Sequence, residues 1–141
     1  MDAREAIERL GLVPHPEGGW YRETWRADAP PGERSAGSAI LFLLAAGERS
    51  QWHRVIDATE LWLFNAGDPL ELRVIAAPGP EVITILGSDL AVGHRPQAIV
   101  PPGAWQGARP LGAWTLVSCI VVPAFEFAAF ELAPEGWEPE A

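Results

Sequence analysis

The stretch that decides the fold is Gly47–Gly67, which reads GERSQWHRVIDATELWLFNAG. It predicts two strands, one around His53 and one that begins at Glu60. Because side chains two residues apart lie on the same face of a strand, an inward-pointing His53 brings Gln51 and Val55 to the inner face with it. By the same rule, Trp62 and Phe64 share the face of the glutamate that begins the second strand. The stretch therefore predicts polar groups above an aromatic floor, which is the usual composition of a small-molecule pocket.

A second segment, PPGAWQ, turns through Pro-x-Gly and ends on Gln106. The spacing of Gly, His, Glu and Gly in the first stretch resembles the first cupin motif, and PPGAWQ resembles the second. The cupin pattern has two further histidines, and this sequence carries Val55 and Gln106 in their places.

The resemblance extends over nearly the whole chain. Six segments are similar to successive landmarks of the cupin-5-like (DUF985-type) family: GLVPHPEGGWYRETWR, SAILFLL, SQWHRV, ELWLFNAGDPLEL, RPQAIVPPGAWQGAR and LVSCIVVPAFEFAAFELAP. The resemblance implies an all-β fold, the cupin double-stranded β-helix or jelly-roll barrel with a short N-terminal helix, and subunits that pair as homodimers. It implies little about the reaction, because one fold hosts many chemistries.

Composition agrees with this fold class. A length of 141 residues fits a single domain, residues 1–141, and the 14 Gly and 14 Pro between short apolar runs indicate many turns. Asp2 is expected to cap a helix that ends at Leu10, and Pro134–Ala141 is expected to be a frayed tail. The predicted strands are Trp20–Trp25, Ser38–Leu44, Ser50–Val55, Glu60–Asn65, Leu70–Ala76, Glu81–Leu86, Ala98–Val100, Trp105–Ala108, Trp114–Val122 and Phe127–Leu132.

Charge and apolar runs bear on partners and location. The formal net charge of −9 argues against nucleic acid and anionic membrane surfaces as partners. The longest apolar run, Ala39–Ala46, is far below the ~20 residues that span a bilayer. A single cysteine, Cys119, and an N-terminus without an apolar signal core lead us to expect a cytoplasmic protein.

Three polar residues are the best candidates for a site. His53, Glu60 and Gln106 are expected to converge, and together they offer the ligands for a divalent transition metal with open positions. The set is poor, because Val55 cannot ligate and an amide is a weak donor, so a hydrogen-bonded cluster without metal is the favoured interpretation. An acid/base interpretation needs no metal: His53 beside Glu60 forms either a catalytic dyad or a purely structural buried pair.

The residues expected to contact a small-molecule ligand are Gln51, Trp62, Phe64, Gln106 and Glu17. Glu17 precedes a Gly pair, so it either anchors the N-terminal segment or reaches the pocket. His15 and His94 are expected to lie outside the pocket.

The predicted function is a small-molecule-binding cupin, an enzyme of isomerase, epimerase or lyase type acting on a small polar or cyclic metabolite. The alternatives are a non-catalytic binding or storage-like cupin, a metal-dependent oxygenase with a degenerate His/Glu/Gln site, and a purely structural role.

Overall fold

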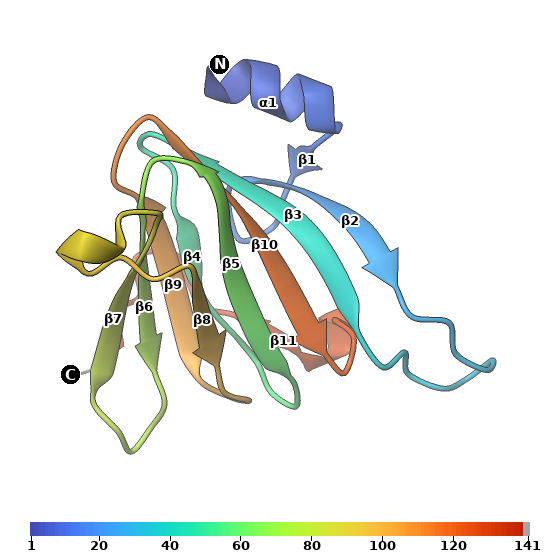
Figure 1. The fold of residues 1–141 in the computed structure, drawn as a ribbon. Coiled ribbons are helices and arrows are strands. Elements are labelled where there is room, and N and C mark those ends of the chain that lie inside the picture. The colour runs from blue at the N-terminus through green and yellow to red at the C-terminus, as the bar shows by residue number, and fades with distance from the viewer. Residues whose placement is uncertain (140–141) are drawn as a thin grey trace.

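Two antiparallel sheets build the fold, as the computed structural model of the protein describes it for residues 1–139 (Figure 1). One sheet has the strand order β1-β2-β3-β10-β5-β8 and the other the order β11-β4-β9-β6-β7. The elements are α1 (Ala3–Leu10), β1 (Val13–Pro14), β2 (Trp20–Arg26), β3 (Ser38–Ala45), β4 (Ser50–Val55), β5 (Thr59–Gly67), β6 (Leu70–Ile75), β7 (Glu81–Leu86), β8 (Gln97–Val100), β9 (Trp105–Pro110), β10 (Trp114–Val122) and β11 (Phe130–Leu132), with 3-10 turns at Leu90–Val92 and Phe127–Ala129.

The predicted all-β fold class is confirmed, and each predicted strand has a counterpart. Two local differences have simple causes. The edge strand β1, Val13–Pro14, pairs with the start of β2 and was not predicted, because two residues are too few to show the alternation of a strand. Phe127–Ala129 forms a 3-10 turn where a strand was predicted, because Phe127 packs edge-to-face on Phe125 and Phe130 while the Ala129 amide donates locally to the Glu126 carbonyl at 3.0 Å.

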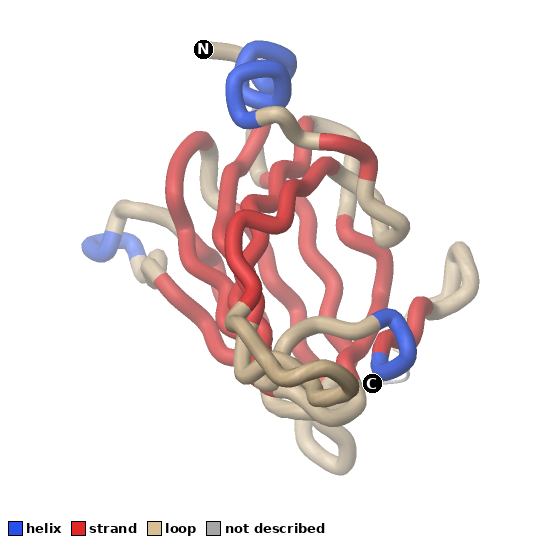
Figure 2. The backbone as a smooth tube through the Cα atoms, turned by 90° about the vertical axis from the view of Figure 1, so that its right-hand side faces the viewer, coloured by secondary structure: helices blue, strands red, loops and turns tan. Residues whose placement is uncertain are grey.

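Helix α1 begins and ends where its capping residues predict. The Asp2 carboxylate accepts a hydrogen bond from the Glu5 amide at 2.9 Å, and Gly11 takes the left-handed conformation with φ of 66° that ends many helices. Ala6 on its inner face packs with Leu12 against the fully buried Leu43. Figure 2 shows α1 at one end of the sheets, and no described helix is long and apolar enough to cross a membrane.

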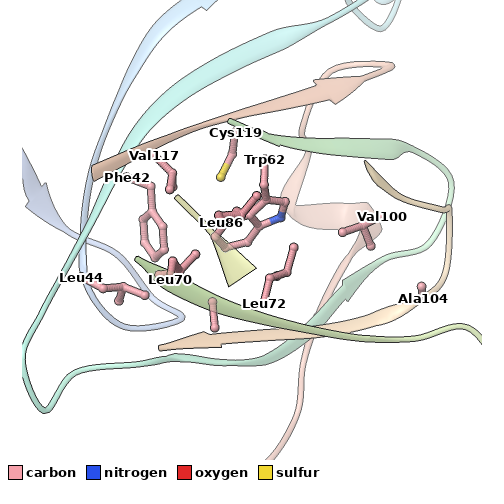
Figure 3. Packing of buried hydrophobic residues seen from close by; sticks show 11 residues of the cluster. Phe42, Leu44, Trp62, Leu70, Leu72, Leu86, Val100, Ala104, Val117 and Cys119 are labelled. Atoms are coloured by element: carbon pink, nitrogen blue, oxygen red, sulfur yellow. The ribbon is translucent and has the colours of Figure 1, made fainter. Parts of the chain in front are cut away.

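The main core lies between the two sheets and is drawn in Figure 3. Trp62 is fully buried and meets Phe42 edge-to-face, with ring centroids 5.9 Å apart. Full burial of side chains such as Leu70 and Leu72 contributes about 1.5–3 kcal/mol each. Cys119 belongs to this core and also lines the cavity described below, so the core forms the floor of that cavity.

The C-terminal segment packs on the outer face of the second sheet. Trp137 lies against Trp105 at 4.8 Å and against Trp52 at 6.5 Å between ring centroids. The Trp52 indole donates to the Glu138 carboxylate at 3.2 Å. The predicted frayed tail is therefore wrong for its described part, because aromatic packing fixes it, while residues 140–141 of that prediction lie outside the described residues.

Candidate active site

A cavity of about 180 Å³ lies between the two sheets. A cavity of about 150 Å³ can hold a benzene ring, so this one has room for a single-ring metabolite. Strands β2, β3, β5 and β10 of one sheet and β4 of the other supply most of its wall. The lining residues are His15, Glu17, Tyr21, Glu23, Arg26, Ser38, Ile40, His53, Val55, Glu60, Cys119, Val121, Phe125 and Phe127.

A bulge in β4 decides which of its side chains enter the cavity. The register between β4 and β9 shifts between Ser50 and His53, so these two residues come to lie on the same side. Ser50 Oγ is 3.4 Å from His53 Nδ1. The same shift turns Gln51 outward, where its side-chain amide donates to the Ala133 carbonyl. Contrary to expectation, the structure does not place Gln51 at the cavity.

Both ring nitrogens of His53 face oxygen atoms. Nε2 lies 2.8 Å from Glu17 Oε2, and Nδ1 lies 2.8 Å from the Gln51 carbonyl. Burial alone would lower the pKa of His53, but the charge and hydrogen bond of Glu17, the charge of Glu60 and the Gln51 carbonyl outweigh it and raise the pKa to about 9. At neutral pH the ring is therefore an imidazolium, and both of its N–H groups donate.

Glu17 both anchors its loop and enters the cavity, the two roles that the sequence left open. Its carbonyl accepts from the Gln51 amide at 2.7 Å. Gly18 allows this approach, since a Cβ atom there would meet the Arg49 carbonyl oxygen at 2.3 Å. Burial acts to raise the pKa of Glu17, but the charge and hydrogen bond of His53 and weaker contacts prevail and hold it below the ordinary value.

Glu60 enters the cavity from β5 without a charged hydrogen-bond partner. Gln106 donates to its Oε1 at 3.0 Å, and the Cys119 thiol donates as well. Burial raises the pKa of Glu60, and the negative charge of Glu17 raises it further. The positive charge of His53 acts in the opposite direction, but the pKa still rises to about 7. No hydrogen bond joins His53 to Glu60 among the described residues, and the carboxylate that pairs with His53 is that of Glu17.

The other predicted ligand contacts lie behind the cavity wall. Gln106 is fully buried, and its Oε1 accepts from the Trp62 indole at 2.7 Å. This contact orients the Gln106 amide, whose nitrogen donates to Glu60. Trp62 belongs to the core, and the half-buried Phe64 packs against it. Inward-facing side chains either line the cavity or fill the core beneath it. The alternation of side chains along a strand does not distinguish these two positions.

His15 lines the cavity, whereas the sequence placed it outside. The turn that leads into β2 brings it inward, because the His15 amide donates to the Gly19 carbonyl at 2.9 Å. Its Nδ1 accepts from the Glu17 amide at 3.0 Å. Burial lowers the pKa of His15, more than the charge of Glu17 raises it, so the ring is neutral at pH 7. His94 lies away from the cavity, as expected, and accepts from the Asp89 amide at 3.2 Å.

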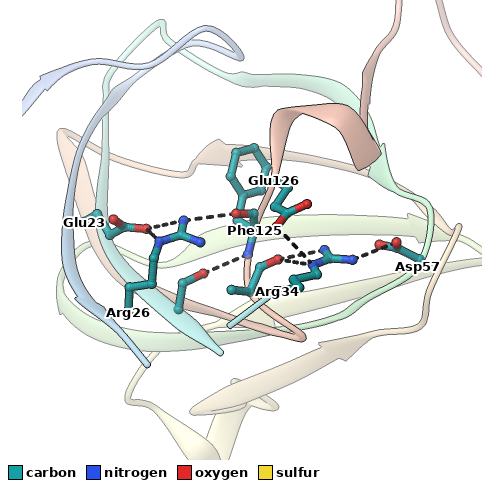
Figure 4. Close-up of polar contacts among 8 residues, drawn as sticks. Glu23, Arg26, Arg34, Asp57, Phe125 and Glu126 are labelled. Atoms are coloured by element: carbon teal, nitrogen blue, oxygen red, sulfur yellow. Dashed lines mark hydrogen bonds and ion pairs between the residues drawn. The ribbon is translucent and has the colours of Figure 1, made fainter. Parts of the chain in front are cut away.

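Two arginines fasten the segment that closes the cavity (Figure 4). Arg34 donates to the Ala124 carbonyl through Nε at 2.9 Å and Nη2 at 2.7 Å, and to Asp57 at 2.7 Å. Arg26 donates to the Phe125 carbonyl at 3.0 Å and pairs with Glu23 at 2.6 Å. Phe125 and Phe127 thereby cover one side of the cavity.

The described residues do not fit a divalent transition metal held by His53, Glu60 and Gln106. The oxygen of Gln106 accepts from the indole, and both ring nitrogens of His53 are engaged by protein oxygens. Within residues 1–139, no group of three or more His, Cys, Asp or Glu side chains is arranged to hold a metal ion.

Two solved structures are similar to this chain over most of its length. A solved structure from Shewanella oneidensis is 40% identical, with a TM-score of 0.88, and the match covers 94% of this chain and 85% of that one. A hypothetical protein from Leishmania major is 35% identical, with a TM-score of 0.84 and coverage of 93% and 86%. A comparison with curated proteins gave no match.

More distant structures share the fold alone. A dTDP sugar isomerase from Desulfovibrio desulfuricans G20 is 16% identical, with a TM-score of 0.63, and the match covers 89% of this chain and 88% of that one.

The model of the family Cupin_5, cupin superfamily (DUF985), matches residues 4–133. The chain therefore belongs to the Cupin_5 family of the cupin superfamily.

Proposed function

We propose that this cupin is an acid–base enzyme that moves a proton on a small polar or cyclic metabolite, in a reaction of isomerase, epimerase or lyase type. The observation that carries the proposal is the buried set of Glu17, His53 and Glu60 in the wall of one cavity of about 180 Å³. Buried titratable groups with opposed pKa shifts in a cavity are typical of acid–base sites.

Glu60 is the group that transfers the proton. General acid–base catalysis is most efficient when the pKa of the group lies near the working pH, and the pKa of Glu60 is about 7. Its ionised form accepts a proton from a substrate carbon, and its protonated form returns one. Gln106 fixes the carboxyl by donating to Oε1 at 3.0 Å.

The ion pair of His53 with Glu17 supplies fixed charge beside this carboxyl. Removal of a proton from carbon leaves negative charge on the substrate, and an imidazolium held in place stabilises that charge without reorganisation. Glu17 keeps His53 protonated and oriented through the 2.8 Å contact between Oε2 and Nε2.

The remaining wall selects the shape of the substrate. Tyr21, Ile40, Val55, Phe125 and Phe127 present aromatic and apolar surface to the cavity. An aromatic face suits a planar or cyclic group. The substrate is therefore a molecule of about one ring in size, with its polar atoms toward the carboxyl groups and its apolar part toward these side chains.

A second candidate is a cupin that binds such a ligand without turning it over. The observation that favours it is that the polar network is already satisfied by the protein: His53 by Glu17 and the Gln51 carbonyl, and Glu60 by Gln106 and Cys119. A fully bonded network makes a rigid binding wall as well as a catalytic one.

Hydrogen exchange of candidate substrates distinguishes the acid–base enzyme from the non-catalytic binding protein. The protein is incubated in D₂O with a panel of keto acids, hydroxy ketones and cyclic ketones, and proton NMR follows the loss of C–H signals next to carbonyl groups. We expect the wild type to catalyse exchange of at least one compound. Glu60→Gln should lower that rate by about 10²–10⁴-fold, the usual contribution of such a group.

The control is Glu33→Gln, which changes an exposed carboxylate outside the cavity and should exchange like the wild type. Exchange at the wild-type rate in Glu60→Gln would remove Glu60 from the mechanism. Saturable binding of a panel compound with no exchange in any variant would instead identify the non-catalytic binder.

A further inference from the structure

The backbone fixes the tautomer of His15. The Glu17 amide donates a hydrogen bond to His15 Nδ1 at 3.0 Å. A ring nitrogen that accepts carries no proton, so the neutral imidazole holds its proton on Nε2. His15 therefore presents Nε2 as a hydrogen-bond donor.

That donor has no hydrogen-bond partner among the described residues, and its ring is part of the cavity wall. The side chain of His15 is only 6% exposed and lines the cavity, and Nε2 forms no hydrogen bond with any described residue. Within residues 1–139, every fully buried side-chain nitrogen or oxygen has a hydrogen-bond partner. Since Nε2 has no such partner, it is not fully buried, and it belongs to a ring that lines the cavity.

Aromatic packing holds the ring in this orientation. Tyr21 meets His15 edge-to-face with centroids 4.5 Å apart at 75°, and Phe42 does so at 5.6 Å and 74°. A donor that is already oriented loses little entropy when it binds an acceptor. The ring is also neutral, because burial lowers its pKa.

From this geometry we propose that His15 Nε2–H binds a carbonyl oxygen of the substrate, which makes the substrate a small aldehyde or ketone. The inference rests on the proposed function, since Glu60 takes the proton from the carbon next to that carbonyl. The electron pair of the broken C–H bond forms a C=C bond to the carbonyl carbon, and the C=O π pair moves to oxygen. The resulting enolate oxygen accepts from His15 more strongly than the carbonyl does, and Glu60 then returns the proton to carbon.

The chain contains a matched control for this donor. His94 Nδ1 also accepts from a backbone amide, that of Asp89 at 3.2 Å, which leaves Nε2 as the donor of this ring as well. His94 does not line the cavity. The two histidines share a tautomer and differ in access to a ligand.

Acetohydroxamic acid serves as the probe, because it is a small molecule, neutral at pH 7, whose carbonyl oxygen and N-hydroxyl imitate an enediol in size and shape. It is titrated at pH 7 into protein labelled with ¹⁵N in its histidine rings, and ¹H–¹⁵N spectra follow each Nε2. We expect a saturable shift of the His15 signal and none of the His94 signal. His15→Phe should weaken binding by about 3- to 10-fold, the effect of one neutral hydrogen bond, and His94→Phe should bind like the wild type.

Three results would overturn the proposal: no saturable binding to the wild type, binding that moves other cavity signals but not His15 Nε2, or unchanged affinity in a folded His15→Phe variant. An unchanged His53 signal in His15→Phe shows that the cavity has kept its structure. The titration involves no turnover, so its failure leaves the exchange test of Glu60 standing, and failure of that test leaves this binding result intact.

Discussion

Glu17 and Glu60 are two buried carboxyl groups whose surroundings give them opposite properties. Removing a charge from water costs several kcal/mol unless a partner compensates it. Glu17 has such a partner in His53, 2.8 Å away, and its pKa lies below the ordinary value. Glu60 has only the neutral donors Gln106 and Cys119, and its pKa rises to about 7. One cavity thus holds an ion pair beside a carboxyl group that titrates near neutral pH.

This difference predicts how stability depends on pH. The pKa of Glu60 rises from 4.5 to about 7 on folding, so its stabilising contribution is present below pH 4.5 and is lost as pH rises through 7. The pKa of His53 rises from 6.5 to about 9, so its contribution is present below pH 6.5 and is lost as pH rises through 9. Each shift corresponds to on the order of 3 kcal/mol. The lowered pKa of His15 acts in the opposite direction, because its stabilising contribution is gained as pH rises toward 6.5, but this shift is the smaller one. We therefore expect the free energy of unfolding to fall from pH 5 to pH 9.

Urea denaturation at a series of pH values checks this. Glu60→Gln should remove the part of the decline between about pH 5 and 7 and leave the later part. Glu33→Gln, exposed and outside the cavity, should follow the wild-type curve. A Glu60→Gln curve parallel to the wild type between pH 5 and 7 would show that Glu60 titrates normally.

At the scale of elements, the sequence correctly predicted the face on which the side chains of β5 lie. It did not predict how deeply each of them is buried. The alternation in β5 placed Glu60 and Trp62 on one face correctly, but one lines the cavity and the other fills its floor. In β4 the bulge between Ser50 and His53 interrupts the alternation of inward and outward side chains, and no residue pattern in the sequence predicts this bulge. His15 lies in a turn, where periodicity gives no information, so only the three-dimensional arrangement brings it to the site.

The segment between β10 and β11 is held over the cavity by Arg34, which donates twice to the fully buried Ala124 carbonyl. We predict that Arg34→Gln loosens this segment and lowers the free energy of unfolding by about 1–3 kcal/mol, because a buried carbonyl loses its charged donor. Hydrogen–deuterium exchange should become faster over residues 124–130.

The control is Arg4→Gln, in which an exposed helix arginine loses only its contact with Glu8. Such surface pairs contribute little, so exchange over 124–130 should not change. Equal exchange of this segment in Arg34→Gln and in the wild type would show that other contacts hold the cover in place.

At the scale of the whole molecule, apolar side chains remain exposed on the edge strands β7 and β8. Val82, Ile83 and Ile99 are 56%, 55% and 60% exposed. Exposed apolar surface of this kind often marks a contact between subunits. We predict a homodimer, with a mass by light scattering of about twice 15.3 kDa at micromolar concentration. A stable mass of one chain under those conditions would contradict the prediction.

The proposed mechanism requires Glu17 to stay ionised while Glu60, in the same cavity, exchanges its proton near neutral pH. The most direct measurement is a ¹³C NMR titration of carboxyl-labelled glutamate, with the two signals assigned through Glu17→Gln and Glu60→Gln. We expect a midpoint of about 7 for Glu60 and no titration of Glu17 between pH 5 and 9. A Glu60 midpoint near the ordinary 4.5 would contradict this expectation.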